Sequence, residues 1–181
     1  DSAEIRKAGE SLGAEVPFLR PEHLATDTAP MLDVMRHAVS VLQKDQVNEI
    51  EALVLLQPTS PLRRPEDIYA ACELLEETHA DVVVSVTEVP HNCVPSSLMY
   101  MEDTHLRSCS AADQPLLRQN KEKLYVRNGP AVLALRIPYL FACSSLYEGN
   151  CRGYVMDREH SIDIDEPLDL LFAEAVLAKR S

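Results

Sequence analysis

Two apolar runs on either side of one helical segment constrain the fold more than any other part of the chain. Residues 53–56 are apolar without interruption, which is typical of a strand buried on both faces of a parallel sheet. Pro65 fits the first turn of a helix whose apolar face carries Ile68, Cys72 and Leu75. A second apolar strand follows at residues 82–86. A strand–helix–strand unit of about 35 residues is a crossover, so the sequence predicts an α/β fold with a mostly parallel sheet and helices on both faces.

The same alternation of elements continues on both sides of this unit. We expect a helix from Ser2 to about Leu12, an amphipathic helix after Thr28, a short helix at 138–146, a strand at 154–156 and a closing helix at 167–179. Residues 90–123 break this rhythm, because polar residues dominate and helical periodicity is absent. We interpret 90–123 as an insertion that reaches away from the main sheet.

Charge and cysteine content exclude several classes of protein. The formal net charge of −12 argues against a broad nucleic-acid-binding face. No apolar run is long enough for a membrane span. The five cysteines form no Cys-x-x-Cys pair and are odd in number, so we expect reduced thiols in a cytoplasmic protein.

Two polar segments are candidates for a site at the carboxyl ends of the strands, where open parallel sheets bind ligands. The loop at 57–63 offers the Gln57 amide, the Ser60 hydroxyl and a guanidinium; the alternative is a proline-stiffened loop with a capping hydroxyl. In Ser161-Ile-Asp-Ile-Asp, an extended chain points Asp163 and Asp165 the same way, which suits Mg²⁺ shared with substrate phosphates. The alternative is that Asp165 only caps the closing helix.

A third group follows at 118–129. Arg118 and Gln119 precede Arg127, Asn128 and Gly129, and a guanidinium is the usual partner of a carboxylate. The alternative is a solvated hairpin, because Asn-Gly is a strong turn signal.

Taken together, these segments resemble the acylneuraminate cytidylyltransferases, the CMP-sialic acid synthetases and their relatives. The resemblance covers essentially the whole chain, in the family's order. It is carried by residues 13–21 running on to 24–29, by Leu55-Leu-Gln-Pro-Thr-Ser-Pro-Leu-Arg63, by Arg118-Gln119, by Asn128-Gly129 and by Ser161-Ile-Asp-Ile-Asp165.

The resemblance implies a Rossmann-like fold of the nucleotide-diphospho-sugar transferase type, with a dimerisation insert. It implies transfer of CMP from CTP to the anomeric hydroxyl of a nonulosonic acid, a nine-carbon α-keto acid sugar, with release of pyrophosphate. Asp163 and Asp165 would hold the Mg²⁺ cofactor, and Arg20 would bind the nucleotide. The residues implied to bind substrate are Gln57, Ser60, Arg118, Gln119 and Asn128, with Arg118 and Gln119 reaching a homodimer partner's site.

The resemblance also suggests that residues 1–181 are one nucleotidyltransferase domain without the family's N-terminal phosphate-loop segment, and that 90–123 are its dimerisation insert. We therefore expect this chain alone to be inactive. Val126 stands where some relatives carry arginine, which leaves the choice of sugar open. Two alternatives remain: a nucleotide-sugar-binding module or inactive fragment, and a related Mg²⁺-dependent sugar transferase.

Overall fold

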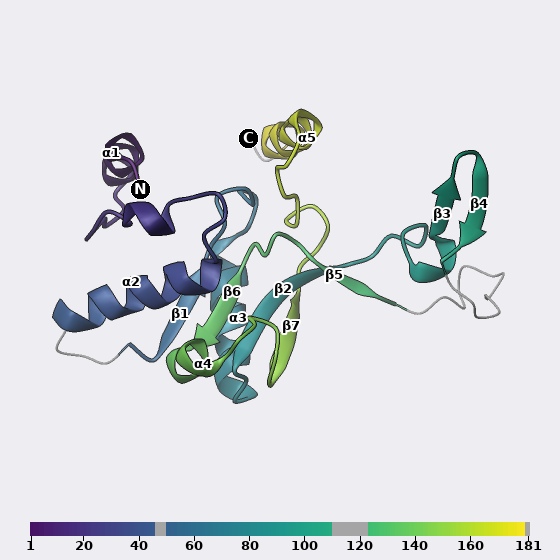
Figure 1. Cartoon of the computed structure of the whole chain (residues 1–181). Coiled ribbons are helices and arrows are strands. Elements are labelled where there is room, and N and C mark those ends of the chain that lie inside the picture. Colours follow the sequence, from purple (N-terminus) through teal and green to yellow (C-terminus); the bar gives the residue numbers. More distant parts are fainter. Residues whose placement is uncertain (46–49, 110–122, 180–181) are drawn as a thin grey trace.

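The computed structural model describes residues 1–45, 50–109 and 123–179. Its helices and strands alternate through the chain, as the sequence predicts (Figure 1). The helices are α1 (Ala3–Ser11), α2 (Met31–Asp45), α3 (Pro65–Glu77), α4 (Ile137–Ala142) and α5 (Pro167–Ala178), with short 3-10 turns η1 (Glu22–Leu24) and η2 (Pro95–Ser97). The strands are β1 (Ala52–Leu55), β2 (Val82–Glu88), β3 (Met99–Glu102), β4 (His105–Ser108), β5 (Tyr125–Arg127), β6 (Leu133–Arg136) and β7 (Cys151–Val155).

The main sheet is built around β2. Strand β7 pairs with one edge of β2 in parallel, while β6 and then β5 pair antiparallel with the other edge, and β1 pairs antiparallel with β6. Because β1 and β2 both run opposite to β6, strands β1, β2 and β7 share one direction. The predicted α/β crossover is confirmed, but β6 lies between its two strands. As a result, the described main sheet is mixed rather than mostly parallel: β2–β7 is a parallel pair, and the other three pairs are antiparallel. Local sequence patterns indicate that a segment is a strand but not which strands pair with it. The position of β6 between β1 and β2 was therefore not predictable from the sequence.

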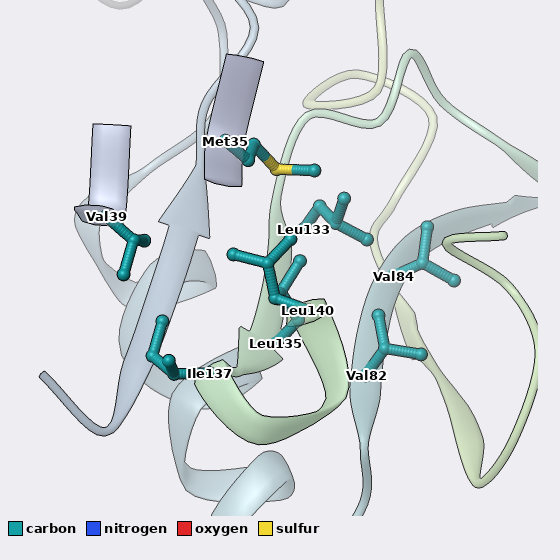
Figure 2. Packing of buried hydrophobic residues seen from close by; sticks show 8 residues of the cluster. All are labelled: Met35, Val39, Val82, Val84, Leu133, Leu135, Ile137 and Leu140. Carbon is teal, nitrogen blue, oxygen red and sulfur yellow. The ribbon is translucent and has the colours of Figure 1, made fainter. Parts of the chain in front are cut away.

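Two layers of apolar side chains hold helices on both faces of the sheet. On one face, Met35 and Val39 of α2 and Leu140 of α4 pack against alternate residues of β2 and β6 (Figure 2). On the other face, Ala71 and Leu75 of α3 pack against the residues between them in the same strands. This alternation is the period of two that a strand covered on both faces requires.

Strands β5 and β6 are two parts of one path along β2. Val86 pairs with Arg127, and Val84 pairs with Leu133. Between these two pairs, the segment from β5 to β6 has four more residues than regular antiparallel pairing with β2 requires. Residues 128–132 form the resulting bulge, which lies opposite Ser85. The hairpin alternative for Asn128-Gly129 is therefore wrong: the turn exists, but it bends a strand that continues in the same direction.

Residues 90–109, which we call the arm, project from the sheet at the far ends of β2 and β5 (Figure 1). The arm carries the β3–β4 hairpin, every residue of which is exposed. Tyr100, Met101 and Leu106 are 62%, 73% and 60% exposed, respectively. The described part of the predicted insertion thus reaches away from the main sheet and presents an apolar surface.

All five cysteines are in the described ranges, and all are free. None of the helices in those ranges combines the length and the apolar character that crossing a lipid bilayer requires.

Candidate active site

Three loops meet where β1 and β7 end. The loop after β1, residues 56–64, runs beside the loop after β7, residues 156–166, and the backbone N–H of Ile164 donates to the carbonyl of Thr59 at 2.8 Å. The Ser60 hydroxyl donates to Asp163 Oδ1 at 3.3 Å. Ser60 is fully buried and Asp163 is half-buried. The two polar segments expected to form a site, whose residues Ser60 and Asp163 are 103 residues apart in the chain, are therefore in contact at the carboxyl ends of parallel strands.

Gly129 of the bulge completes this contact. Its φ of +111° is one that residues with a side chain rarely adopt. A Cβ atom built there would lie 2.8 Å from Ser60 Oγ and 3.0 Å from Asp163 Oδ2. Glycine at this position thus lets the backbone approach the Ser60–Asp163 pair closely.

Arg63 ties the first loop to the bulge. Its Nη1 donates to the carbonyl of Gln57 at 2.7 Å and to the carbonyl of Ala131 at 3.1 Å. Burial lowers the pKa of Arg63. The Gln57 backbone is held by this bond, whereas its half-buried side chain has no hydrogen-bond partner within the described ranges.

Asn128 lies inside the bulge and is only 4% exposed. Its Oδ1 accepts from the Ser85 hydroxyl at 2.6 Å, and its Nδ2 donates to Ser161 Oγ at 2.9 Å. Its amide therefore connects the middle of β2 to the loop that carries Asp163.

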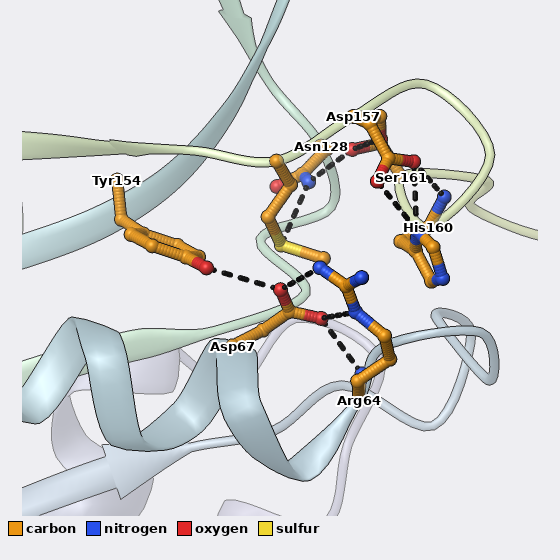
Figure 3. A network of polar contacts seen from close by, with 8 residues as sticks. Arg64, Asp67, Asn128, Tyr154, Asp157, His160 and Ser161 are labelled. Carbon is orange, nitrogen blue, oxygen red and sulfur yellow. Dashed lines mark hydrogen bonds and ion pairs between the residues drawn. The ribbon is translucent and has the colours of Figure 1, made fainter.

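A second polar network supports the same loops from α3 (Figure 3). Asp67, fully buried in the first turn of α3, accepts from the Arg64 backbone and guanidinium and from the Tyr154 hydroxyl, the last at 3.1 Å. Burial by itself would raise the pKa of Asp67, but the hydrogen bonds from Arg64 and Tyr154 outweigh burial and lower it. Burial first, and the bond to Asp67 second, raise the pKa of Tyr154.

The loop after β7 is closed on itself by Asp157 and His160. The Asp157 carboxylate accepts from the backbone of His160 at 3.0 Å and contacts its ring at 2.7 Å (Figure 3). Burial opposes ionisation of Asp157, but these bonds to His160 prevail, so its pKa is lowered. The turn places Ser161, whose hydroxyl donates to the Asp157 carbonyl at 2.7 Å.

Asp165 is exposed and lies just before α5. The residue that flanks the helix is Glu166, and the Asp169 carboxylate accepts from the backbone N–H groups of Asp165 and Glu166, at 3.1 and 2.9 Å. The alternative that Asp165 caps the closing helix is wrong. Its carboxylate is therefore available for another role.

The remaining candidates are not joined to this cluster by described contacts. Arg20 is half-buried and forms an ion pair with Asp1 in the N-terminal segment. Arg118 and Gln119 lie outside the described residues.

A cavity of about 650 Å³ lies beside Asp163, between the loop after β7 and α5. Its lining includes Asp163, Phe172 and Val176 and two cationic side chains, Arg158 and Lys179. Within the described ranges, no group of three or more His, Cys, Asp or Glu side chains gathers as a metal cage.

Sequence reasoning missed the buried polar residues that support the site. Ser85 stands in the apolar run Val82-Val-Val-Ser-Val86, and a hydroxyl in a strand buried on both faces was a readable signal of an internal hydrogen bond. An acidic residue in the first turn of a helix, such as Asp67, is explained by the helix dipole without burial, so the full burial of Asp67 was not signalled by the sequence. Tyr154 gave no signal, since its partner is 87 residues away.

Comparison with known proteins identifies relatives of the chain, although no family model matches it. The chain is 32% identical to the N-acylneuraminate cytidylyltransferase of Escherichia coli O18:K1:H7, with 100% of this chain and 41% of that protein covered. It is also 32% identical to the CMP-N,N'-diacetyllegionaminic acid synthase of Legionella pneumophila, with 98% of this chain and 75% of that protein covered. The chain thus spans less than half of the first relative and three quarters of the second.

A solved structure supports the fold. The CMP:2-keto-3-deoxy-manno-octonic acid synthetase complexed with CTP superposes with a TM-score of 0.65 at 18% identity, covering 100% of this chain and 79% of that one. The sequence likeness, over almost the whole chain and most of the Legionella protein, establishes the relationship. The chain belongs to the acylneuraminate cytidylyltransferase family of CMP-sugar synthetases.

Proposed function

We propose that the protein transfers CMP from CTP to a nonulosonic acid. The anomeric hydroxyl of the sugar attacks the α-phosphorus, the bond from that phosphorus to the bridging oxygen breaks, and pyrophosphate leaves with the electron pair while the hydroxyl proton is lost. No covalent enzyme intermediate is needed. The protein's contribution is positioning of the two reactants and neutralisation of charge.

The observation that carries this proposal is the meeting of Ser60, Gly129 and Asp163 at the carboxyl ends of β1 and β7. Three loops distant in the chain supply a buried hydroxyl, a close backbone approach and a carboxylate at one point. The same point borders the cavity lined by Asp163. In a chain of this family, that arrangement is best explained as the place where the nucleotide and the sugar meet.

Asp163 and Asp165 fit a Mg²⁺ ion. Both are carboxylates on one loop, Asp165 is not used as a helix cap, and Mg²⁺ binds proteins through one or two carboxylates with substrate phosphates and water as further ligands. Bound there, the ion would supply neutralisation of the CTP phosphate charge. The Ser60 hydroxyl would orient the Asp163 carboxylate.

The other substrate contacts follow the family resemblance. Gln57, with its backbone fixed by Arg63 and its side-chain amide uncommitted, would contact the acyl group of the sugar. Arg20 would bind the nucleotide. Arg118 and Gln119 would reach the sugar carboxylate in a partner subunit's site.

A homodimer is part of this proposal. The arm presents Tyr100, Met101 and Leu106 to solvent, and a projecting apolar hairpin of this kind is typical of an interaction surface. A second copy of the chain is the partner that the resemblance implies, because a two-fold dimer would bring each arm to the other subunit. Five free cysteines support a cytoplasmic location, where thiols stay reduced.

The test is pyrophosphate release by the full-length gene product with CTP and a panel of acid sugars: sialic, legionaminic, pseudaminic and 2-keto-3-deoxy-manno-octonic acids. We expect release that requires CTP, one of the nine-carbon sugars and Mg²⁺, and that Asp163→Asn abolishes. Binding of CTP without turnover for any sugar would instead support a nucleotide-binding module. Preference for the eight-carbon sugar would show that the substrate class is wrong.

A further inference from the structure

A chain of hydrogen bonds runs from the centre of β2 to the loop that carries Asp163. Ser85 Oγ donates to Asn128 Oδ1 at 2.6 Å, and Asn128 Nδ2 donates to Ser161 Oγ at 2.9 Å. Ser161 in turn donates to the Asp157 carbonyl at 2.7 Å. Ser85 also accepts from the Val132 backbone at 2.8 Å, so it is fixed in orientation. The chain therefore links a rigid strand to a loop through one side-chain amide.

The Asn128 amide has no hydrogen-bonding capacity left for a ligand. Its oxygen accepts from the Ser85 hydroxyl and, at 3.4 Å, from the Ala131 backbone. Its nitrogen donates to Ser161 Oγ and to the Met156 sulfur, the latter at 3.4 Å. An asparagine side chain offers two donor hydrogens and one oxygen with two lone pairs, and all are in use. A sugar atom could bind this amide only by displacing an internal partner from a side chain that is 4% exposed.

The bond to Ser161 is one of few that hold Asp163 in place. Ser161 precedes Asp163 by two residues, and Ile164 follows it and is anchored to Thr59. Within the described ranges, the hydrogen bond of the Asp163 carboxylate itself is the 3.3 Å contact with Ser60. Because hydrogen bonds weaken with length, the carboxylate also depends on its two neighbours in the loop, the Ser161 side chain and the Ile164 backbone.

We infer that Asn128 and Ser161 are positioning residues, which set the place of Asp163 through their mutual hydrogen bond, and that Asn128 does not touch the sugar. This inference rests on the proposed function for the role of Asp163. It assigns to Ser161, which lines the cavity beside Asp163 but whose hydroxyl is engaged with Asn128 and Asp157, a part in catalysis through Asp163. Asn128, expected from the sequence to bind substrate, acts from inside the protein.

The experiment compares Ser161→Ala with Ser161→Thr, which restores a hydroxyl, and with Ser144→Ala, a matched control. Ser144 also donates one side-chain hydrogen bond, at 3.0 Å to Glu148, but in an exposed turn that is not part of the site. All are made in the full-length gene product. Pyrophosphate release gives kcat and the KM for the sugar, and hydrogen–deuterium exchange follows the Ile164 amide.

We expect Ser161→Ala to lower kcat by about 10- to 100-fold, since a displacement of about 1 Å has effects of this size. The KM for the sugar should stay within about twofold, because the Ser161 hydroxyl is already engaged with Asn128 and Asp157. The Ile164 amide should exchange up to about tenfold faster, since one hydrogen bond is worth about 1 kcal/mol. Ser161→Thr should recover most of kcat and of the protection, and Ser144→Ala should change none of the three readouts.

Asn128→Ala and the double variant Asn128→Ala/Ser161→Ala test whether the two residues act through the same hydrogen bond. If the residues act through one bond, the double variant has the kcat of Asn128→Ala alone. Multiplied effects on kcat, or a sugar KM that rises in Asn128→Ala but not in Ser161→Ala, would show that Asn128 binds the sugar and would overturn the inference. Unchanged exchange at Ile164 in Ser161→Ala would overturn it as well. If the unaltered protein releases no pyrophosphate with any sugar, the proposed function fails, and the exchange measurement alone decides whether the bond positions the loop.

Discussion

Substitution of Gly129 by alanine tests the close packing of the three loops. The backbone at φ +111° is strained for any residue with a Cβ atom, which costs about 1–3 kcal/mol. The added atom would also lie 2.8 Å from Ser60 Oγ and 3.0 Å from Asp163 Oδ2, and overpacking of this kind costs a further 1–3 kcal/mol or so. Ser60 is fully buried and has little room to move. We expect Gly129→Ala to lower the free energy of unfolding by about 2–6 kcal/mol.

Urea denaturation of the full-length gene product, with Gly13→Ala as the control, separates the two contributions. Gly13 has a φ of +86°, but a Cβ atom there meets nothing within 4 Å, so its substitution costs only backbone strain. Combining Gly129→Ala with Ser60→Ala should recover part of the loss, with a coupling energy of about 0.5–3 kcal/mol. Equal losses for Gly129→Ala and Gly13→Ala, together with no coupling to Ser60, would refute the close approach.

Three further predictions concern single side chains. Asp67→Asn should cost about 1–3 kcal/mol of stability at neutral pH. The folded-state pKa of Asp67 lies below its unfolded value of about 3.9, so its contribution is present above that pH and is lost as the pH falls through the folded pKa. Urea melts between pH 2 and 7 should therefore show that the stability of the variant declines less steeply in acid than that of the unaltered protein. Asp165→Asn should lower CTP turnover by about 10²- to 10³-fold with an unchanged melting temperature. Asp169→Ala, which removes the hydrogen bonds to the backbone at the start of α5, should instead remove about 1 kcal/mol of stability. Normal turnover of Asp165→Asn across a Mg²⁺ titration would contradict the metal assignment. Leu106→Lys in the arm should weaken dimerisation at least about tenfold in sedimentation velocity, while Glu73→Lys, at an exposed position on α3 outside the arm, serves as the control. A stable monomer of the unaltered protein would end the dimer proposal.

The regular elements were predictable because their patterns are local. The crossover from β1 through α3 to β2 follows from two apolar runs and a proline at the helix start. The position of β6 between β1 and β2 was not predictable, since strand order is decided by packing between segments far apart. The closing helix was predicted at 167–179 and α5 is present, but its apolar residues Leu168, Leu171 and Phe172 are each more than half exposed.

The site was predictable as a set of residues rather than as an arrangement. The sequence pointed to Gln57, Ser60, Asn128 and Asp163, and the structure brings their loops together. The orientation of each side chain could not be predicted from local sequence patterns, because it depends on contacts between segments that are far apart in the chain. An exposed turn and an internal bulge both favour Asn-Gly, so the inward orientation of the Asn128 amide follows only from its burial and its hydrogen bonds to Ser85 and Ser161.

The bulge opposite Ser85 divides the ladder of β2 into an inner part, paired with β6, and an outer part, paired with β5 and leading to the arm. The outer part connects the arm to the point where Ser85 and Asn128 meet. Strand β7 pairs with β2 on both sides of Ser85, so β2 runs unbroken past the bulge on that edge. A partner that binds the arm is therefore joined to the bulge beside Gly129 by one continuous strand.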